Sequence, residues 1–261
     1  MPEGQDALAA PVARAPTLGE RLAALFPGLD RTSLIVIVVA ALDLLVSSYE
    51  GSTGFFDAKL RPHLHLASHA DSVISHVWWF GTAFVLLLLI PLLVSKLAGG
   101  PSARELGLGV GDWRLGLKVS LGLLALMVPI VAIAARSPAF NQQYPFCADA
   151  LSSWRLLIVY ELGYLAYFIA WEFIFRGWML FGLAPRLGPG LAIVLQALPF
   201  SLMHTGKPEL EAYGSILAGL ALGALAWRTR SMWYGAALHG LVALAMDLFA
   251  GAHRAGVLHH G

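Results

Sequence analysis

The chain has 261 residues, of which 58% are hydrophobic and 13% are charged, and its mean hydropathy is +0.71. Soluble globular domains are about 45–50% apolar and about 25% charged, so this composition excludes a soluble enzyme and a disordered chain. The formal net charge of +1 provides no basic field for nucleic acid. The remaining class is an all-α polytopic membrane protein of six to eight helices.

Seven apolar stretches predict the membrane helices in chain order. They are residues 33–46, 77–94, 115–135, 154–183, 191–203, 212–227 and 232–250. The second stretch carries no charge, and the fourth is too long for one straight span. Residues 1–32 are polar and predict a tail with an amphipathic lead-in, so the first apolar stretch is interpreted as an uncleaved signal anchor.

Lysine and arginine are distributed unevenly between the two sides of the predicted membrane domain. With a cytoplasmic N-terminus, 11 of the 17 basic residues lie inside and 6 lie outside. Because basic residues favour the cytoplasmic side, this topology is the expected one. The inside set is Arg14, Arg21, Arg31, Lys96, Arg104, Arg114, Lys118, Arg176, Arg186, Arg228 and Arg230, and the outside set is Lys59, Arg61, Arg136, Arg155, Lys207 and Arg254.

Small residues recur at every fourth position of the sixth stretch. Ser215, Gly219 and Gly223 share one helix face, and such faces let two membrane helices approach closely. We interpret this face as a helix-packing surface.

Ionisable residues inside membrane segments are costly and are candidates for function. They concentrate in four successive helices towards the C-terminus, and the full set is Asp43, Glu161, Glu172, Arg176, His204, His239 and Asp247. This clustering is the main functional signal in the sequence.

Three of these residues share a face of the long fourth stretch. Glu172 and Arg176 are one helical turn apart, and Glu161 precedes Glu172 by eleven residues, about 20° around the helix and roughly 16 Å along it. A structural ion pair explains Glu172 and Arg176 equally well, and Glu161 is also explained as an interfacial charge.

The two histidines lie on different helices. His204 ends the fifth stretch in the sequence FSLMH, one turn after Phe200, and His239 lies in the middle of the last stretch, two turns before Asp247. A histidine and an aspartate inside one membrane helix favour a functional role over packing.

Two histidines and one glutamate are compatible with two chemistries. Glu172, His204 and His239 would form the His₂Glu ligand set of a catalytic zinc ion, although no HExxH motif accompanies them. Without metal, Glu172 would act as a general base on water, and the histidines would orient that water and stabilise the oxyanion. The other histidines, His63, His65, His69 and His76, lie in a predicted loop and are interpreted as solvated.

The sequences WEFIFRG (171–177), FSLMH (200–204) and GAALHGLVALAMD (235–247) resemble the CPBP family of CAAX prenyl proteases and bacteriocin-processing enzymes, also called the ABI family. The family pattern is EExxxR, FxxxH and HxxxN on successive membrane helices. The resemblance covers residues 150–250, which would form the protease core after N-terminal helices over 33–149 and before a tail over 251–261. It implies about seven to eight helices around a central polar cavity and glutamate-type intramembrane proteolysis.

The resemblance assigns Glu172 to the second glutamate of the first motif and Arg176 to its arginine. Phe200 and His204 fit the second motif, and His239 fits the histidine of the third. Two positions depart from the pattern. Trp171 replaces the glutamate taken as the water-activating base, and Ala243 replaces the asparagine taken as an oxyanion donor. Glu172 would then supply the base, and Asp247 a further polar group.

The leading hypothesis is an endopeptidase that hydrolyses a peptide bond at or within the membrane. Glu172 would activate water with His204 and His239 as partners, supported by Arg176, Phe200, Asp247 and Glu161, and no cofactor would be required. Expected partners are membrane lipids and a peptide or membrane-protein substrate, with no nucleic acid, in a bacterial cytoplasmic membrane. The alternatives are an inactive member that acts as a chaperone, immunity factor or regulatory partner, and a proton-linked transporter.

Overall fold

The computed structural model describes residues 14–25, 28, 30–64 and 71–256, and every regular element within these ranges is helical. The first part comprises α1 (Leu18–Leu25), α2 (Arg31–Tyr49), α3 (Thr53–Phe55), η1 (Phe56–Leu60), η2 (Arg61–His63), α4 (Asp71–Phe84), η3 (Val85–Leu89), α5 (Ile90–Ala98), η4 (Arg104–Leu108), α6 (Trp113–Ala134) and α7 (Pro138–Gln143). The second part comprises η5 (Ala148–Ser152), α8 (Trp154–Glu172), η6 (Phe173–Met179), α9 (Leu180–Leu187), α10 (Pro189–Leu202), α11 (Glu209–Thr229) and α12 (Trp233–Arg254).

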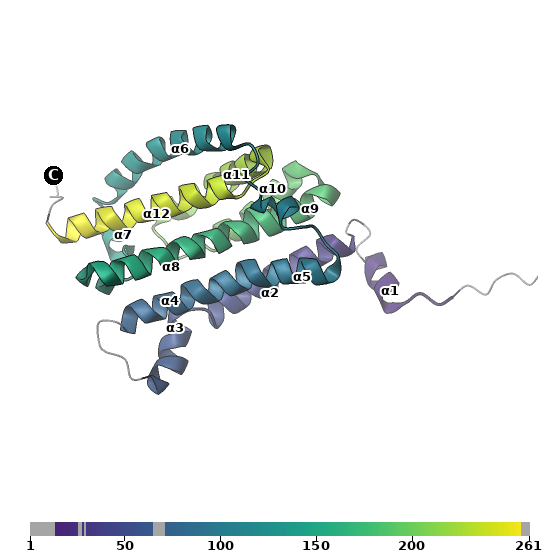
Figure 1. The fold of residues 1–261 in the computed structure, drawn as a ribbon, viewed down its shortest axis with the longest axis horizontal. Coiled ribbons are helices and arrows are strands. Elements are labelled where there is room, and N and C mark those ends of the chain that lie inside the picture. The colour runs from purple at the N-terminus through teal and green to yellow at the C-terminus, as the bar shows by residue number, and fades with distance from the viewer. Residues whose placement is uncertain (1–13, 26–27, 29, 65–70, 257–261) are drawn as a thin grey trace, which may run out of the picture.

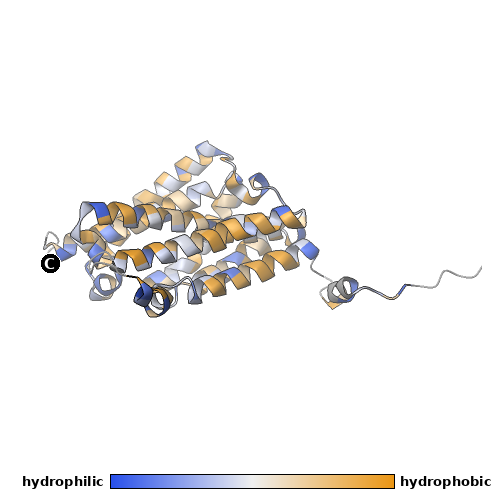
Figure 2. Ribbon diagram, turned by 60° about the horizontal axis from the view of Figure 1, so that its bottom comes forward, coloured by the Kyte–Doolittle hydropathy of each residue, from blue (hydrophilic) through white to orange (hydrophobic). Residues whose placement is uncertain are grey.

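Six helical segments in the described part of the chain are long and apolar enough to cross a membrane. They are Arg31–Tyr49, Ser72–Ala98, Arg104–Ala134, Trp154–Leu187, Glu209–Thr229 and Trp233–Arg254, and α10 is a shorter apolar helix. Apolar side chains such as Leu42, Leu121 and Leu248 are exposed on these helices, and hydrophilic residues concentrate near the helix ends (Figure 2). Each predicted apolar stretch corresponds to a helix, which confirms the polytopic all-α bundle.

The long helices lie side by side, with α8 between α4 and α12 (Figure 1). Helix α6 packs on the outer side of α12, and α10 packs against α11 and α9. This arrangement surrounds α8 on several sides. The second half of its helical segment is therefore the most deeply buried part of the fold, and every residue from Ala170 to Ala184 is buried.

The helix that begins with α8 continues without interruption through η6 into α9. Its middle section, η6, is π-helical, and such wide turns occur frequently at functional sites. Because a π-turn inserts an extra residue, it changes the direction in which the following side chains point. Glu172 is the last residue of α8, and Arg176 lies within η6.

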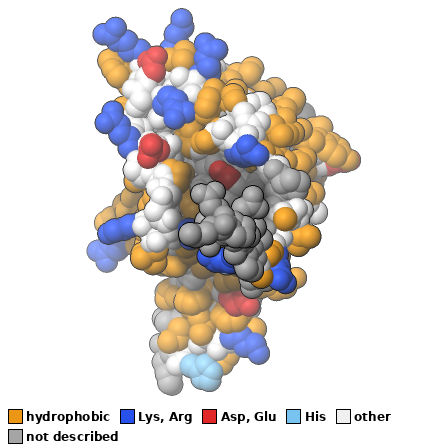
Figure 3. All heavy atoms as spheres, turned by 90° about the vertical axis from the view of Figure 1, so that its right-hand side faces the viewer, with side chains coloured by type: hydrophobic (Ala, Val, Ile, Leu, Met, Phe, Trp, Pro, Cys, Tyr) orange, Lys and Arg blue, Asp and Glu red, His pale blue; other side chains and the backbone are white. Residues whose placement is uncertain are grey.

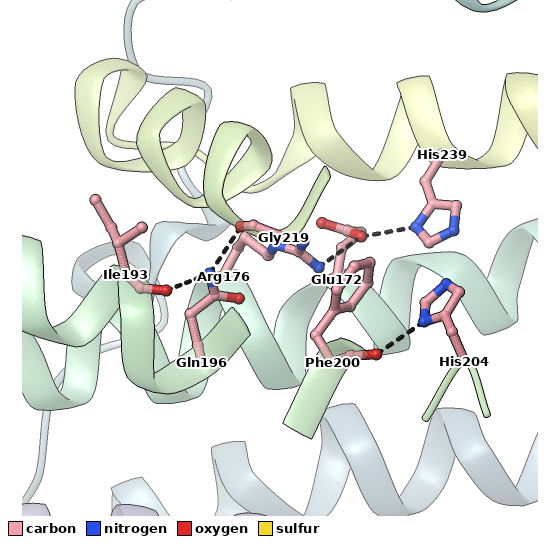
Figure 4. A network of polar contacts seen from close by, with 8 residues as sticks. All are labelled: Glu172, Arg176, Ile193, Gln196, Phe200, His204, Gly219 and His239. Carbon is pink, nitrogen blue, oxygen red and sulfur yellow. Dashed lines mark hydrogen bonds and ion pairs between the residues drawn. The ribbon is translucent and has the colours of Figure 1, made fainter. Parts of the chain in front are cut away.

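The small-residue face of α11 packs against α10, as predicted. A Cβ atom on Gly219 would lie 3.1 Å from both Ala197 Cβ and Phe200 Cδ1, so a larger residue there would push the two helices slightly apart. At the same crossing, the Gln196 amide donates hydrogen bonds of 2.9 Å to the carbonyl oxygens of Ile193 and Gly219 (Figure 4). These contacts fix α10, which carries Phe200 and leads into His204.

The two ends of the bundle differ in charge. One end carries the start of α2 and the ends of α5, α9 and α11, and Lys and Arg side chains surround it (Figure 3). The basic residues that the chain places there are Arg31, Lys96, Arg104, Arg114, Lys118, Arg186, Arg228 and Arg230. Arg176 was assigned to this side from the sequence, but it is fully buried inside the bundle and does not belong to the charged end.

Candidate active site

Three separate helical elements bring the predicted site residues together. Glu172 ends α8, His204 lies in the turn after α10, and His239 lies in α12. Figure 4 shows their side chains converging between these elements, with Glu172 between Arg176 and His239. Helix packing therefore brings Glu172 and His239 into contact although they are 67 residues apart in the chain.

Arg176, Glu172 and His239 form a linear chain of charge-assisted hydrogen bonds. Arg176 Nη1 donates to Glu172 Oε1 over 3.0 Å, and His239 Nδ1 donates to the same oxygen over 2.8 Å. The side chains of Glu172 and Arg176 are fully buried, whereas 18% of the His239 side chain is exposed. A buried carboxylate requires such partners because burial of an unpaired charge is very costly.

His204 is held by a different acceptor. Its Nδ1 donates to the carbonyl oxygen of Phe200, one turn earlier, over 2.8 Å. Since both imidazoles donate through Nδ1, the neutral tautomer of each leaves Nε2 as a free acceptor. Two bases of this kind can accept both hydrogens of one water molecule.

A cavity of about 330 Å³ adjoins both imidazoles. Aromatic side chains from α4, α8 and the loop before α8 form most of its wall, and α2 and the α3 region contribute hydroxyl groups. The lining residues are Ser47, Ser48, Ser52, Thr53, Trp79, Phe146, Tyr164, Tyr167, Phe168, Trp171, Met203, His204, Lys207 and His239. The wall is thus more aromatic than the polar cavity that the family resemblance implies.

Glu172 does not line this cavity. Its Oε2 is buried without a hydrogen-bond partner among the described residues, and it faces Gly235 of α12. A Cβ atom built on Gly235 would lie 2.9 Å from this oxygen. The carboxylate therefore sits behind His239, and a direct attack on cavity water by Glu172 has no support in this arrangement.

Phe200 connects the members of the site. The guanidinium carbon of Arg176 lies 4.0 Å from the centroid of its ring, and the centroids of His204 and His239 lie 4.7 Å and 6.0 Å away. A cation over an aromatic face is attracted by the ring quadrupole. Phe200 thus stabilises the buried guanidinium and limits the orientations of both imidazoles.

Glu161 and Asp247, the other predicted supports, do not contact this group. Neither residue lines the cavity, and neither is hydrogen-bonded to Glu172, His204 or His239 among the described residues. Asp247 is 2% exposed, and both of its carboxyl oxygens are buried without a partner there. Both acids lie one or more turns beyond the site on their own helices.

Trp171 and Ala243, the two positions that depart from the family pattern, are both buried. Trp171 is 6% exposed, stacks on Tyr167 at 5.4 Å between centroids, and forms part of the cavity wall. Ala243 is buried at 5%. Trp171 therefore fills volume where the family pattern has a carboxylate, and it cannot accept a proton.

Sequence reasoning missed the aromatic wall and Lys207. The sequence placed Lys207 only among the basic residues of the outside set, yet it lines the cavity together with His204. Its backbone N–H donates to the His204 carbonyl over 3.2 Å, so one tight turn carries both side chains. Lys207 follows the candidate residue His204 by three positions, and this spacing was the sequence feature that could have placed it at the site.

The environment of His204 favours its neutral form. Burial, together with the positive charge of Lys207, lowers the pKa of His204 from 6.5 to about 4. An imidazole with this pKa is a hydrogen-bond acceptor at neutral pH.

The predicted His₂Glu zinc set does not fit the observed geometry. Among the described residues, no group of three His, Cys, Asp or Glu side chains is arranged to hold a metal ion. Glu172 Oε1 is already bonded to Arg176 and His239, and its carboxylate lies outside the cavity. Of the loop histidines, His65 and His69 lie outside the described residues.

Comparison with known proteins finds one family model that is similar to the C-terminal region. Residues 153–245 match the family model described as type II CAAX prenyl endopeptidase Rce1-like. No curated protein and no solved structure matches the chain. The matched residues begin directly before α8 and end within α12, so they include Arg176, Glu172, His204 and His239. Over these residues the chain is similar to the Rce1-like CAAX prenyl endopeptidases, in agreement with the resemblance of its three motifs to the CPBP family.

Proposed function

We propose that this protein is a membrane endopeptidase that hydrolyses a peptide bond in the cavity beside His204 and His239. The observation that carries the proposal is the buried chain from Arg176 through Glu172 to His239, whose last member reaches the cavity. A carboxylate that holds an imidazole by Nδ1 is the arrangement that makes Nε2 a general base. The family match supports peptide hydrolysis as the reaction class.

In the proposed mechanism, His239 acts on water and Glu172 acts through His239. His239 Nε2 takes a proton from water while the water oxygen attacks the carbonyl carbon of the scissile bond. Glu172 remains ionised and stabilises the imidazolium that forms. The imidazolium then protonates the amide nitrogen as the carbon–nitrogen bond breaks. His204 Nε2 accepts the second hydrogen of the water and orients it.

This mechanism needs no carboxylate at position 171. The direct role expected for Glu172 is replaced by an indirect one, because the carboxylate is bonded to His239 and lies outside the cavity. Glu172 and Arg176 are therefore positioning residues, and His239 and His204 are the catalytic residues. The mechanism also routes no step through a metal ion.

We further propose that the basic end of the bundle faces the cytoplasm. The N-terminus of α2 lies at that end, whereas the cavity that His204 and Lys207 line is also lined by Ser47 and Ser48, near the C-terminal end of α2. Cleavage would then occur towards the non-cytoplasmic side of the membrane, expected to be that of a bacterium, with lipids around the exposed apolar faces. The substrate would be a peptide or a membrane-protein segment that enters from that side.

Cleavage of a peptide library by the purified protein in detergent tests the proposed reaction. We expect His239→Gln to lower kcat by about 10²–10⁴-fold because the general base is lost. Glu172→Gln is expected to lower kcat strongly with KM changed only a few-fold, since Glu172 does not contact substrate. A metal chelator is expected to leave the activity intact.

Asp43→Asn is the matched control, because it makes the same acid-to-amide change at a buried membrane position outside the cavity. Full activity of His239→Gln would contradict the mechanism. Loss of activity with the chelator would indicate metal-dependent chemistry. Absence of cleavage in every form would favour the inactive family member that acts as a regulatory partner.

A further inference from the structure

The cavity has one permanently charged side chain on its wall. Lys207 supplies it, and none of the described residues that line the cavity is Asp or Glu. The remaining wall is formed by aromatic, hydroxyl and imidazole side chains and by Met203. An ammonium group in such surroundings interacts more strongly with an anion than it would in water, because the effective dielectric constant is lower.

Two contacts fix the position of the Lys207 ammonium. Its Nζ lies 2.9 Å from Glu211 Oε1, one turn further along the chain, and it lies 5.4 Å from the centroid of Phe146. Glu211 is itself held by the Tyr144 hydroxyl, which donates to the carboxylate over 2.7 Å. The ammonium is therefore preorganised at the edge of the cavity.

This ammonium retains hydrogen-bonding capacity. A lysine ammonium has three N–H donors, and the contacts among the described residues occupy one of them, with Glu211. The side chain is 23% exposed, so an incoming group can reach it.

We propose that Lys207 binds a carboxylate of the peptide substrate and thereby selects substrates with an acidic group near the scissile bond. The inference rests on the proposed endopeptidase function. Charge-assisted hydrogen bonds from an ammonium to a carboxylate are short and strong, and the tight turn from His204 to Lys207 sets a fixed offset between the carboxylate and the catalytic imidazole. The carboxylate is either the C-terminus of a short peptide or an Asp or Glu side chain.

Three fluorescent octapeptides of one apolar sequence distinguish these sources. One has a free C-terminus, the second is amidated, and the third is amidated with Glu as its last residue. Binding is measured by fluorescence anisotropy, and cleavage is measured in parallel as kcat/KM. We expect wild type to bind at least one of the two acidic peptides about tenfold or more tightly than the neutral amide.

Two variants separate substrate binding from a structural role. Lys207→Met is expected to abolish the preference for acid over amide while leaving affinity for the neutral amide within a few-fold. The double variant Lys207→Glu/Glu211→Lys keeps an ion pair between the same positions but places a negative charge on the cavity wall. It is expected to disfavour both acidic peptides and to favour an amidated peptide ending in Lys.

Equal binding of all three peptides to wild type would overturn the inference. Equal losses for acidic and neutral peptides in Lys207→Met would also overturn it, and would assign the ammonium to oxyanion stabilisation or to folding. Preferential binding of an acidic peptide without any cleavage would support the role of Lys207 in binding and refute the proposed endopeptidase activity.

Discussion

Glu172 contributes to the site through the groups that it holds. Its carboxylate bonds to Arg176 and His239, and neither Glu172 nor Arg176 is exposed. A buried ion pair is weak evidence for stability, since desolvation offsets much of the attraction. Retention of this pair is more easily explained by orientation of His239, because the carboxylate fixes which ring nitrogen carries the proton.

The burial of His204 should make the stability of the folded protein depend on pH. Its pKa is about 4 in the folded chain and is expected near 6.5 in the unfolded chain. As the pH falls below 6.5, the unfolded chain binds a proton that the folded chain does not bind. Stability is therefore expected to fall by up to about 1.4 kcal/mol per pH unit until about pH 4.

Thermal unfolding in detergent between pH 4 and pH 8 measures this effect. Tm of His204→Gln should depend less steeply on pH than Tm of wild type between 6.5 and 4. Superimposable slopes for the two proteins would show that His204 is protonated equally in both states.

At the level of elements, the contact between α8 and α12 sets the distance from Glu172 to His239. Gly235 lies one turn before His239 on α12, directly against Glu172 Oε2. The π-helical η6 begins directly after Glu172 at the end of α8, and it turns Arg176 back towards the Glu172 carboxylate. A change in either helix therefore moves the carboxylate relative to the imidazole.

Gly235→Ala tests this contact. The new Cβ would lie 2.9 Å from Glu172 Oε2, so the carboxylate has to move away from His239. We expect kcat to fall by about tenfold or more, since a displaced carboxylate no longer orients the catalytic imidazole of His239, and we expect Tm to fall. Gly122→Ala in α6 is the control, because no atom lies within 4 Å of its Cβ position.

The control should raise stability by up to about 1 kcal/mol, the usual advantage of alanine over glycine within a helix. Activity of Gly235→Ala equal to that of wild type would mean that the position of Glu172 is not critical.

For the whole molecule, the two ends of the bundle differ in charge, and the candidate site lies away from the basic end. Basic residues surround the end that carries the start of α2 (Figure 3), whereas the turn with His204 and Lys207 lines a cavity together with Ser47 and Ser48, near the C-terminal end of that helix. Orientation in the membrane consequently decides which compartment supplies the substrate. The charge asymmetry predicts a cytoplasmic basic end.

Single cysteines at the two ends test this orientation. In a Cys147→Ser background, Ala139→Cys lies in α7 at the site end, and Ala103→Cys lies just before η4 at the basic end, and both positions are exposed. A membrane-impermeant maleimide should label Ala139→Cys in intact cells. It should label Ala103→Cys only after permeabilisation, and the reverse pattern would place the site in the cytoplasm.

The helices and most of the residues at the candidate site could be predicted from the sequence pattern. The apolar stretches 77–94 and 232–250 appear within the spans Ser72–Ala98 and Trp233–Arg254, because the length of an apolar run fixes whether a helix can cross the membrane. The motifs also identified Glu172, Arg176, His204 and His239 before their distances were known.

The arrangement of these residues in space depends on the tertiary structure. Helical periodicity placed Glu161 on the same face as Glu172, but it could not determine which face points towards the cavity. That depends on the rotation of each helix against its neighbours and on the π-turn in η6. Glu172 lies behind His239, and Lys207 lies with His204 on the cavity wall. Both placements arise from contacts between α8, α12 and the turn after α10. Such contacts join residues far apart in the chain, so no local pattern encodes them.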